Sequence, residues 1–302
     1  MKKIAALLIS LILAGCQNKP IYKDTRLALG TYIKITSNDK RAAKIVFDEI
    51  DRIENLLSKY KPDSEISKLN RLGRLKVSLE TFYIIKKAKE FCQLSNGAFD
   101  ITIAPLMDLW GFTDKKFRIP ETKEIKNTLK LIGSEKLVLN EFESVIELSF
   151  PGMKIDLGGI AKGFALDCAV KKLKGNFITS CLISAGQVYA LGNNSGKPWK
   201  IAIKDPRAQI TAGKIELIDQ SVATSGDYEQ YFTVNGKRFS HIMDPRTGYP
   251  AESKVISATV VASDGLTADA LSTAIFVLGK LKGEELVKKF PGTKIKTICQ
   301  TN

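Results

Sequence analysis

The sequence has 302 residues, of which 44% are hydrophobic and 26% charged, and its formal net charge is +14. This hydrophobic fraction is enough for a sizeable core and excludes an intrinsically disordered chain. The basic residues are scattered without an aromatic-basic motif, which argues against nucleic-acid binding. With one histidine, His241, the chain is also poor in zinc ligands, so any metal should be a hard cation bound by oxygen.

The N-terminus has the layout of a bacterial lipoprotein signal. Two lysines precede an apolar run from Ile4 to Ala14, which is too short to span a bilayer. The run ends in Leu-Ala-Gly before Cys16, a lipobox-like sequence, and acylation of that cysteine would anchor the chain. The alternative is an ordinary signal peptide with a coincidental cysteine. We expect a signal peptide over 1–15, a lipidated tether over 16–24, and one domain over 25–302, exported and facing the periplasm or extracytoplasmic space.

Hydrophobic periodicity predicts the first half of the domain. Leu27 to Ile35 alternates and is β-rich, which predicts a strand with Gly30 inside it. Apolar residues at spacings of three and four predict amphipathic helices from Lys40 to Ser58 and from about Leu79 to Leu94. Between them, Asp63 or Ser64 could cap a short helical segment that carries Ile66 and Leu69.

The second half mixes hairpins with helices. Leu137 to Leu139 and Val145 to Phe150 predict a hairpin, and Lys154 to Leu157 predicts a strand that runs through two glycines into a helix. Further strands are predicted around Cys181 to Ile183, Trp199 to Ile203 and Val255 to Val261, and a helix from about Ala268 to Leu278. Because hairpins are frequent, an α+β fold is favoured over a doubly wound parallel sheet.

Four cysteines follow Cys16 in the sequence: Cys92, Cys168, Cys181 and Cys299. None belongs to a CxxC pair, and several lie among apolar residues, so most are interpreted as buried small hydrophobes. A disulfide formed after export remains open, because the pairing cannot be assigned from sequence.

The strand-to-helix junction from Asp156 to Gly163 has the chemistry of an anion site. Adjacent glycines at a helix start let backbone amides approach an anion, and the helix dipole favours phosphate. Lys162, one turn into the helix, could add a charge-assisted contact. The segment is neither a Walker A loop nor a GxGxxG fingerprint. By itself its signal is weak, because a glycine junction of this kind is more often purely structural.

Two further segments carry polar groups suited to catalysis. Asp269 and Thr273 are four apart in a predicted helix and share a face, where a carboxylate and a hydroxyl suit Mg²⁺. The structural alternative is that Asp269 caps the helix. His241 ends a predicted strand and meets a loop dense in turn formers, which makes it a candidate general base. In the segment from Asn96 to Phe112, core packing explains the aromatic residues as well as ligand stacking does.

Six motifs in order resemble the ApbE family, the FAD:protein FMN transferases. They are Gly-Thr-Tyr, Tyr-Lys-Pro-Asp-Ser-Glu-Ile-Ser-Lys-Leu-Asn, Gly-Ala-Phe-Asp-Ile-Thr, Asp-Leu-Gly-Gly-Ile-Ala-Lys-Gly, His-Ile-Met-Asp-Pro-Arg-Thr-Gly-Tyr-Pro and Ala-Asp-Ala-Leu-Ser-Thr-Ala. The resemblance covers roughly Leu27 to Gly279. It implies a single ApbE-like, T-fold-related catalytic domain of the α+β class.

The resemblance also implies a residue set. FAD contacts fall on Leu29, Tyr60, Ala98, Phe99, Asp100, Asp156, Lys162, and Ile242 or Met243. A Mg²⁺ ion would be held by the carbonyl of Gly159 and the side chains of Asp269 and Thr273, with Ser272 adjacent. Leu29 stands where methionine is frequent, and Ala185 to Val188 departs from the usual Gly-Gly-Asp-Val, which puts any role of that loop in doubt.

The implied reaction is transfer of FMN from FAD to a threonine hydroxyl of an acceptor protein, with Mg²⁺ on the pyrophosphate and AMP released. His241 would orient or deprotonate that hydroxyl, and Asp269 would act through the metal. Acceptors would be exported or membrane redox subunits with an Asp-x-x-(Ser/Thr)-x-(Ala)-Thr-like motif. Two alternatives remain open: an FAD pyrophosphatase that gives FMN and AMP, and a lipoprotein that binds flavin without chemistry.

Overall fold

A computed structural model describes residues 20–208 and 210–300. The predicted signal peptide and the predicted lipidation site, Cys16, lie outside the described residues. Among the described helices, none combines the length and the apolar composition that crossing a bilayer requires.

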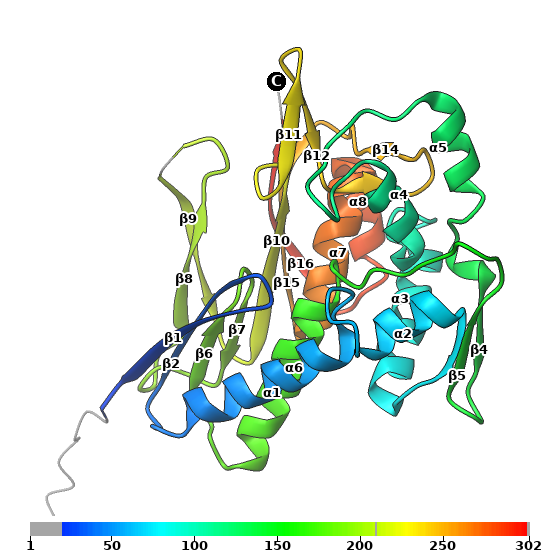
Figure 1. Ribbon diagram of the computed structural model, residues 1–302. Helices are drawn as coiled ribbons and strands as arrows, with labels where there is room; N and C mark the ends of the chain where they lie inside the picture. The colour runs from blue at the N-terminus through cyan, green and yellow to red at the C-terminus, as the bar shows by residue number, and fades with distance from the viewer. Residues whose placement is uncertain (1–19, 209, 301–302) are drawn as a thin grey trace, which may run out of the picture.

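The fold is built on a seven-stranded sheet in which every neighbouring pair is antiparallel. Figure 1 shows the sheet between a layer of helices and a separate hairpin. The strands lie in the order β1 (Tyr22–Ala28), β2 (Thr31–Ser37), β6 (Cys181–Ser184), β7 (Val188–Leu191), β10 (Gln220–Gly226), β15 (Val255–Ala262) and β16 (Lys294–Gln300). Hairpins and packed helices together confirm the predicted α+β class.

Helices cover one face of this sheet. Helix α7 (Gly265–Leu278) packs on β10 and β15, α6 (Ala161–Gly175) packs on α7, and α1 (Ala42–Leu57) packs on α6 and β2. The main hydrophobic core lies between α7 and α3 (Leu79–Leu94), and a second core lies between α1, α6 and β2. Residues of α7 point into the core on nearly all sides, as expected of a helix that is apolar all round.

The opposite face is partly covered by the hairpin of β8 (Trp199–Lys204) and β9 (Thr211–Leu217). Trp199, Ile215 and Leu217 of this hairpin pack on Val222 and Val261 of the sheet. Strand β15 is therefore buried on both faces, which explains its continuous apolar sequence.

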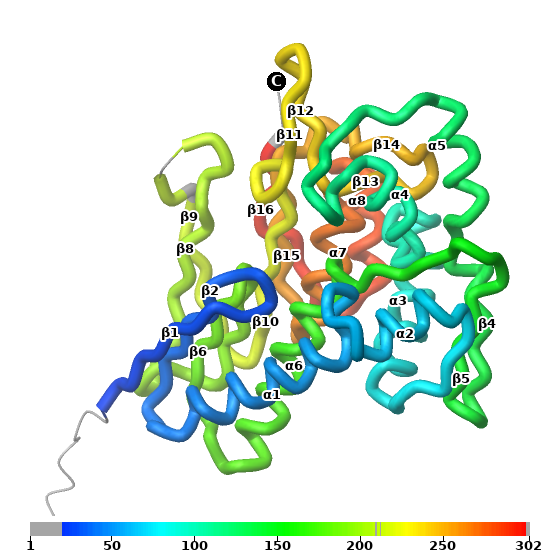
Figure 2. The backbone as a smooth tube through the Cα atoms, viewed as in Figure 1, coloured from blue at the N-terminus to red at the C-terminus, as the bar shows by residue number. Residues whose placement is uncertain are grey.

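The remaining elements surround the helical layer, as the tube in Figure 2 traces. They are α2 (Glu65–Leu72), β3 (Arg74–Lys76), η1 (Ile101–Ile103), α4 (Ala104–Leu109), α5 (Thr122–Leu129), η2 (Ser134–Lys136), β4 (Leu137–Asn140), β5 (Val145–Leu148), β11 (Tyr231–Val234), β12 (Lys237–Ser240), β13 (Met243–Asp244), β14 (Tyr249–Pro250) and α8 (Lys280–Val287). Strands β3, β5 and β4 form a small sheet, and β11–β12 and β13–β14 form hairpins.

Helices α1 and α3 confirm the helical periodicity in the sequence. The α3 boundaries are those predicted, because Ser78 caps its start by accepting a hydrogen bond from the Thr81 amide. Of the two candidate caps for α2, Ser64 is the one used, and it accepts from the Ser67 amide. The predicted hairpin of β4 and β5 is also present.

The prediction of one strand from Leu27 to Ile35 is wrong, because the segment is a hairpin. Strands β1 and β2 pair through Ala28 and Thr31, with Leu29 and Gly30 as the two turn residues. Their φ angles are 51° and 70°, and two successive positive φ values characterise a tight hairpin turn. Residues paired across a two-residue loop are three apart and share a face, so the alternation shifts by one position at the turn: Ala28, Ile33 and Ile35 are buried, whereas Leu27 is exposed. Strand β1 includes Tyr22–Asp24, which the sequence assigned to the tether.

The strand predicted from Lys154 to Leu157 is also wrong: among the residues that the structure describes, this segment joins no sheet. The side chain of Asn70 takes the place of a neighbouring strand, since its amide accepts from the Ile155 N–H at 2.7 Å and donates to the Ile155 carbonyl at 2.9 Å. The Asp156 amide donates to the Ile101 carbonyl at 2.7 Å. These contacts satisfy the buried backbone.

The four cysteines after the predicted lipidation site are free in the structure. Cys92 and Cys181 are buried, whereas Cys168 and Cys299 are half-buried. Burial raises the pKa of Cys92, Cys168 and Cys181 to about 12, so these thiols stay protonated and behave as small apolar groups.

Candidate active site

A cavity of about 250 Å³ opens where the start of α6, helix α7 and the β10–β13 region meet. It gathers most of the residues singled out in the sequence: Tyr60, Ala98, Phe99, Asp100, Asp156, Gly159, Lys162, His241, Ile242, Met243, Asp269 and Thr273. A second cavity of about 260 Å³ adjoins it and is lined by Leu29. The two cavities share Tyr60, Asp156, Gly158 and Lys162.

The start of α6 presents backbone amides to the cavity wall. The Asp156 carboxylate accepts from the Gly158 amide at 2.8 Å, which fixes the turn that leads into the helix. Ile160 stands at the N-cap and supplies no side-chain cap; the Ala161 amide donates to the Leu157 carbonyl at 2.8 Å, and the Gly163 amide donates to Asp269 at 3.0 Å. Such a helix start, next to the Lys162 ammonium, favours a bound anion.

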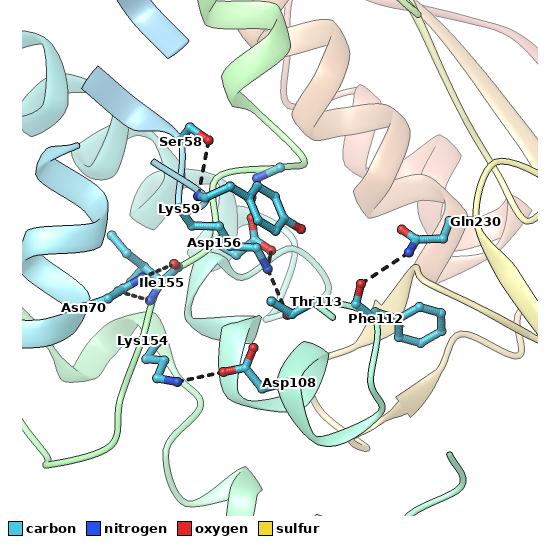
Figure 3. A network of polar contacts seen from close by, with 12 residues as sticks. Ser58, Lys59, Asn70, Asp108, Phe112, Thr113, Lys154, Ile155, Asp156 and Gln230 are labelled. Atoms are coloured by element: carbon cyan, nitrogen blue, oxygen red, sulfur yellow. Dashed lines mark hydrogen bonds and ion pairs between the residues drawn. The ribbon is translucent and has the colours of Figure 1, made fainter. Parts of the chain in front are cut away.

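Lys59 is a site residue that the sequence did not reveal. Its ammonium lies 2.8 Å from the Asp156 carboxylate and 3.2 Å from the Thr113 hydroxyl, as Figure 3 shows. Both side chains of the ion pair are largely buried, with 10% and 13% of their surface exposed. Burial lowers the pKa of Lys59, but the attraction and the hydrogen bond of Asp156 more than offset it, so the pKa is raised and the lysine is charged.

Gly159, Asp269 and Thr273 line the cavity together. A Cβ built on Gly159 would lie 3.4 Å from the Thr273 hydroxyl oxygen, so the Gly159 main chain is against Thr273. Asp269, one turn before Thr273 on α7, uses Oδ2 to accept from the Gly163 amide at 3.0 Å. Among the described residues nothing bonds its other oxygen, Oδ1. A carbonyl, a carboxylate and a hydroxyl are hard oxygen ligands, so this donor set fits Mg²⁺.

Asp269 is therefore not the cap of its own helix. Asp264 has that role, because it accepts from the Thr267 amide at 2.8 Å. Burial raises the pKa of Asp269, against the opposing effects of Lys162 and of the Gly163 amide. A carboxylate in such surroundings is stabilised by a nearby cation.

The side chain of Ser272 does not line the cavity. It is fully buried between α7 and β10, where its hydroxyl donates to the Asp269 carbonyl at 2.9 Å and contacts the Ser225 hydroxyl at 2.8 Å. Ser225 also contacts the Thr273 hydroxyl at 3.1 Å and lines the cavity. Ser272 thus connects the α7 backbone to β10, and Ser225 is a neighbour of Thr273 that the sequence motifs did not indicate.

His241 follows β12 directly and is held by the carbonyl of Gln230. Its amide donates to that carbonyl at 3.0 Å, and Nδ1 lies 3.0 Å from the same oxygen. A carbonyl accepts only, so Nδ1 carries the proton and Nε2 keeps a free lone pair. Burial lowers the pKa of His241, with the Gln230 bond opposing, so the ring is neutral at pH 7.

Glu229, next to Gln230, also lines the cavity. Burial raises its pKa, while Lys162 lowers it. It lies in a segment with no periodicity or motif of its own, so no signal in the sequence distinguished it from a surface acid.

The segment after α3 divides its residues between the core and the cavity. Asp100 is fully engaged, because its carboxylate accepts from the amides and hydroxyls of Thr102 and Ser134 at 2.6–2.9 Å. Trp110 and Phe112 are buried in an aromatic cluster with Phe239, so core packing accounts for them. Phe99, by contrast, lines the cavity beside Gly159.

The unusual loop from Ala185 to Val188 connects β6 and β7 next to Lys162. A Cβ built on Gly186 would lie 3.9 Å from the Lys162 ammonium nitrogen. Gln187 is 3% exposed, and neither its amide nitrogen nor its amide oxygen finds a hydrogen-bond partner among the described residues. The loop therefore supports the wall behind Lys162 but leaves one buried polar group unsatisfied.

Comparison with known proteins gives consistent results. The sequence pattern of the ApbE family matches residues 29–296. A curated FAD:protein FMN transferase of Klebsiella pneumoniae is 35% identical over 271 residues, which cover 87% of this chain and 84% of the relative. Another, from Haemophilus influenzae, is 32% identical and covers 95% of this chain and 89% of its own length.

Solved structures agree in fold. The crystal structure of an ApbE protein from Thermotoga maritima superposes with a TM-score of 0.85 at 36% identity, covering 94% of this chain and 97% of that one. A structure of the flavin transferase ApbE from Vibrio cholerae gives a TM-score of 0.78 at 28% identity, covering 92% and 97% of the two chains.

Proposed function

The chain belongs to the ApbE family and is an FAD:protein FMN transferase, and on that premise we propose a specific reaction. In this reaction the protein uses Mg²⁺ to move FMN from FAD onto a threonine hydroxyl of an acceptor protein, and AMP is released. The observation that carries this proposal is that Gly159, Asp269 and Thr273 line one cavity together, beside Lys162 and the start of α6.

The FAD would extend through both cavities. They share Tyr60, Asp156, Gly158 and Lys162, so a ligand longer than either cavity passes Lys162 and the start of α6 where they join. A pyrophosphate at that junction would meet backbone amides and an ammonium. Because the carboxylate of Asp100 is already engaged, the contact from Asp100 would come from its main chain.

A Mg²⁺ ion on Gly159, Asp269 and Thr273 would neutralise charge on the pyrophosphate as its P–O bond breaks. The protein's own share of the work is to fix these oxygen donors. Asp269 is anchored by the Gly163 amide, and Thr273 is anchored by the Ser225 hydroxyl. Such fixed donors need little reorganisation during the reaction.

His241 would act as the general base. The acceptor threonine oxygen forms a bond to the FMN-side phosphorus, its proton moves to Nε2, and the bond to the bridging oxygen breaks with its electron pair leaving on AMP. The neutral ring and the proton fixed on Nδ1 both support this assignment.

Intact-mass analysis tests the reaction directly. The purified chain would be incubated with FAD, Mg²⁺ and a redox-subunit fragment that carries the acceptor motif. The acceptor should gain one FMN minus water, and AMP should appear in equal amount. Release of free FMN with an unmodified acceptor would replace the transferase mechanism by a pyrophosphatase one. Flavin binding without release of AMP would instead indicate a protein that binds flavin and does no chemistry.

Two threonines of α7 provide a matched test of the metal site. Thr273→Val removes a hydroxyl from the cavity, whereas Thr267→Val changes a partly exposed threonine of the same helix outside it. We expect Thr273→Val to raise the Mg²⁺ requirement and Thr267→Val to leave it unchanged. Asp269→Asn should lower transfer by at least about 100-fold, on the scale of a lost transition-state contact.

We also propose that the chain is an exported lipoprotein anchored through Cys16, which would place it beside membrane redox complexes. Support comes from the apolar run and the lipobox-like sequence that precede Cys16. Metabolic labelling with palmitate should mark the wild type and fail to mark Cys16→Ser. Equal labelling of both would remove Cys16 as the anchor.

A further inference from the structure

The first-turn amides of α6 and of α7 are each bound by a carboxylate of the other helix. Asp167 of α6 accepts from the two leading amides of α7, with 2.6 Å to the Gly265 nitrogen and 2.9 Å to the Leu266 nitrogen. In the opposite direction, Asp269 of α7 accepts from the Gly163 amide of α6 at 3.0 Å. Each helix therefore receives the other's N-terminal amides on a carboxylate.

Between these two carboxylates the helix backbones are in direct contact. A Cβ built on Gly265 would lie 2.5 Å from the Gly163 carbonyl oxygen, and one built on Gly163 would lie 2.1 Å from the Gly265 carbonyl oxygen. Only glycine permits this approach. The two helices are thus fixed in separation by the glycines and in register by the reciprocal carboxylates.

Asp167 is not needed as an ordinary cap of α7. Asp264 stands at the N-cap and accepts from the third helical amide, Thr267. Asp167 takes the first and second amides instead, so carboxylates bind each of the first three amides of α7. Asp167 lines neither of the two cavities of the site; it lines a separate groove with residues of α1 and α3. Asp167 therefore does not contact the substrate cavity, and its partners are on α7.

We propose that Asp167 is a positioning residue for the metal ligands. By binding the start of α7, it sets the register in which Asp269 lies over the Gly163 amide with Oδ1 free and Thr273 lies against Gly159. The inference rests on the proposed Mg²⁺ site. Burial raises the pKa of Asp167 to about 7, against the opposing bonds from the Gly265 and Leu266 amides. Above that pH the group is a carboxylate, and its charge-assisted bonds to the helix amides are strong enough for this role.

The test compares Asp167→Ala with Asp264→Ala in the full chain. Both variants remove a carboxylate from the start of α7, but only the first removes the connection to α6. Hydrogen exchange of the peptide around Gly163 reports whether Asp269 still accepts from that amide. A Mn²⁺ titration followed by electron paramagnetic resonance, with and without FAD, reports the metal affinity directly.

For Asp167→Ala we expect at least tenfold faster exchange at Gly163 and about tenfold weaker Mn²⁺ binding, within the 10–100-fold range of outer partners of metal ligands. Asp264→Ala should melt at a lower temperature yet bind Mn²⁺ within about twofold of wild type, since the register is kept. Asp167→Asn, which keeps one acceptor oxygen, should be intermediate and serves if the alanine variant does not fold.

Wild-type Mn²⁺ affinity and unchanged Gly163 exchange in a folded Asp167 variant would overturn the inference, as would an equal loss of affinity in Asp264→Ala. Failure of the proposed function itself looks different. In that case the wild type binds no Mn²⁺, while the exchange at Gly163 still shows whether Asp167 holds Asp269 in place.

Discussion

Substituting Gly163 by alanine should separate the two helices that carry the site. The new methyl group would lie 2.1 Å from the Gly265 carbonyl oxygen and 2.4 Å from its carbon, both of which are backbone atoms that cannot rotate away. Ordinary contact begins near 3.4 Å, so relief requires a local movement of 3.4 − 2.1 = 1.3 Å. The hydrogen bond between the Gly163 amide and Asp269, now 3.0 Å, would then be stretched or broken.

The expected cost has two parts. Overpacking of this kind lowers stability by about 1–3 kcal/mol. A displacement of about 1 Å in a catalytic arrangement costs on the order of 100-fold in rate, so kcat/KM for FMN transfer should fall by that factor. The assay measures transfer by intact mass and stability by urea denaturation on the same preparations.

Gly175→Ala is the matched control, because Gly175 ends the same helix and a Cβ there meets nothing within 4 Å. It should leave transfer unchanged and stability equal or slightly higher. Transfer by Gly163→Ala within about threefold of wild type, well short of the 100-fold loss, would refute the view that close approach of α6 and α7 positions Asp269.

Three further predictions concern other parts of the site. Because burial holds the pKa of His241 below 6.5, kcat/KM should be level near pH 7 and fall as the pH drops through that lowered pKa. The stability that the neutral ring contributes is fully present above pH 6.5 and is lost as the pH falls through the same lowered pKa. An acid limb that persists in His241→Gln would assign the titration to another group. Lys59→Met leaves the Asp156 carboxylate unpaired and should lower the free energy of unfolding by about 3 kcal/mol, with much of it recovered in the double variant with Asp156→Asn; simple additivity would show that the pair is not coupled. Gln187→Met replaces an unsatisfied buried amide by an apolar chain of similar length, so urea denaturation should show equal or higher stability; a loss of more than about 1 kcal/mol would mean that the amide has a partner in solution.

Local signals in the sequence predicted much of the fold. The start of α3 was predictable because its cap, Ser78, is adjacent to the periodic run it caps. The hairpin turn at Leu29 and Gly30 was not, because leucine is not a residue that signals positive φ. The extended segment at Ile155 depends on Asn70, which is 85 residues away, and no local pattern reveals such a partner.

The site divides in the same way. Ordered motifs predicted Asp269, Thr273 and Gly159, and the structure places them together. Lys59 and Asp167 lie outside the residues those motifs assigned, and each matters only through a partner distant in sequence. Residues that act by binding another site residue, far away in the sequence, are therefore the ones that a single sequence does not reveal.

The burial of α7 has a consequence for how the enzyme tolerates mutation. Asp269 and Thr273 lie on the helix that packs against β10, β15 and α6, so these two proposed metal ligands cannot separate without opening the core. Local opening of such a segment costs nearly as much as global unfolding. A substitution elsewhere that lowers the free energy of unfolding should then reduce the fraction of folded, active molecules, while each folded molecule keeps its normal turnover rate.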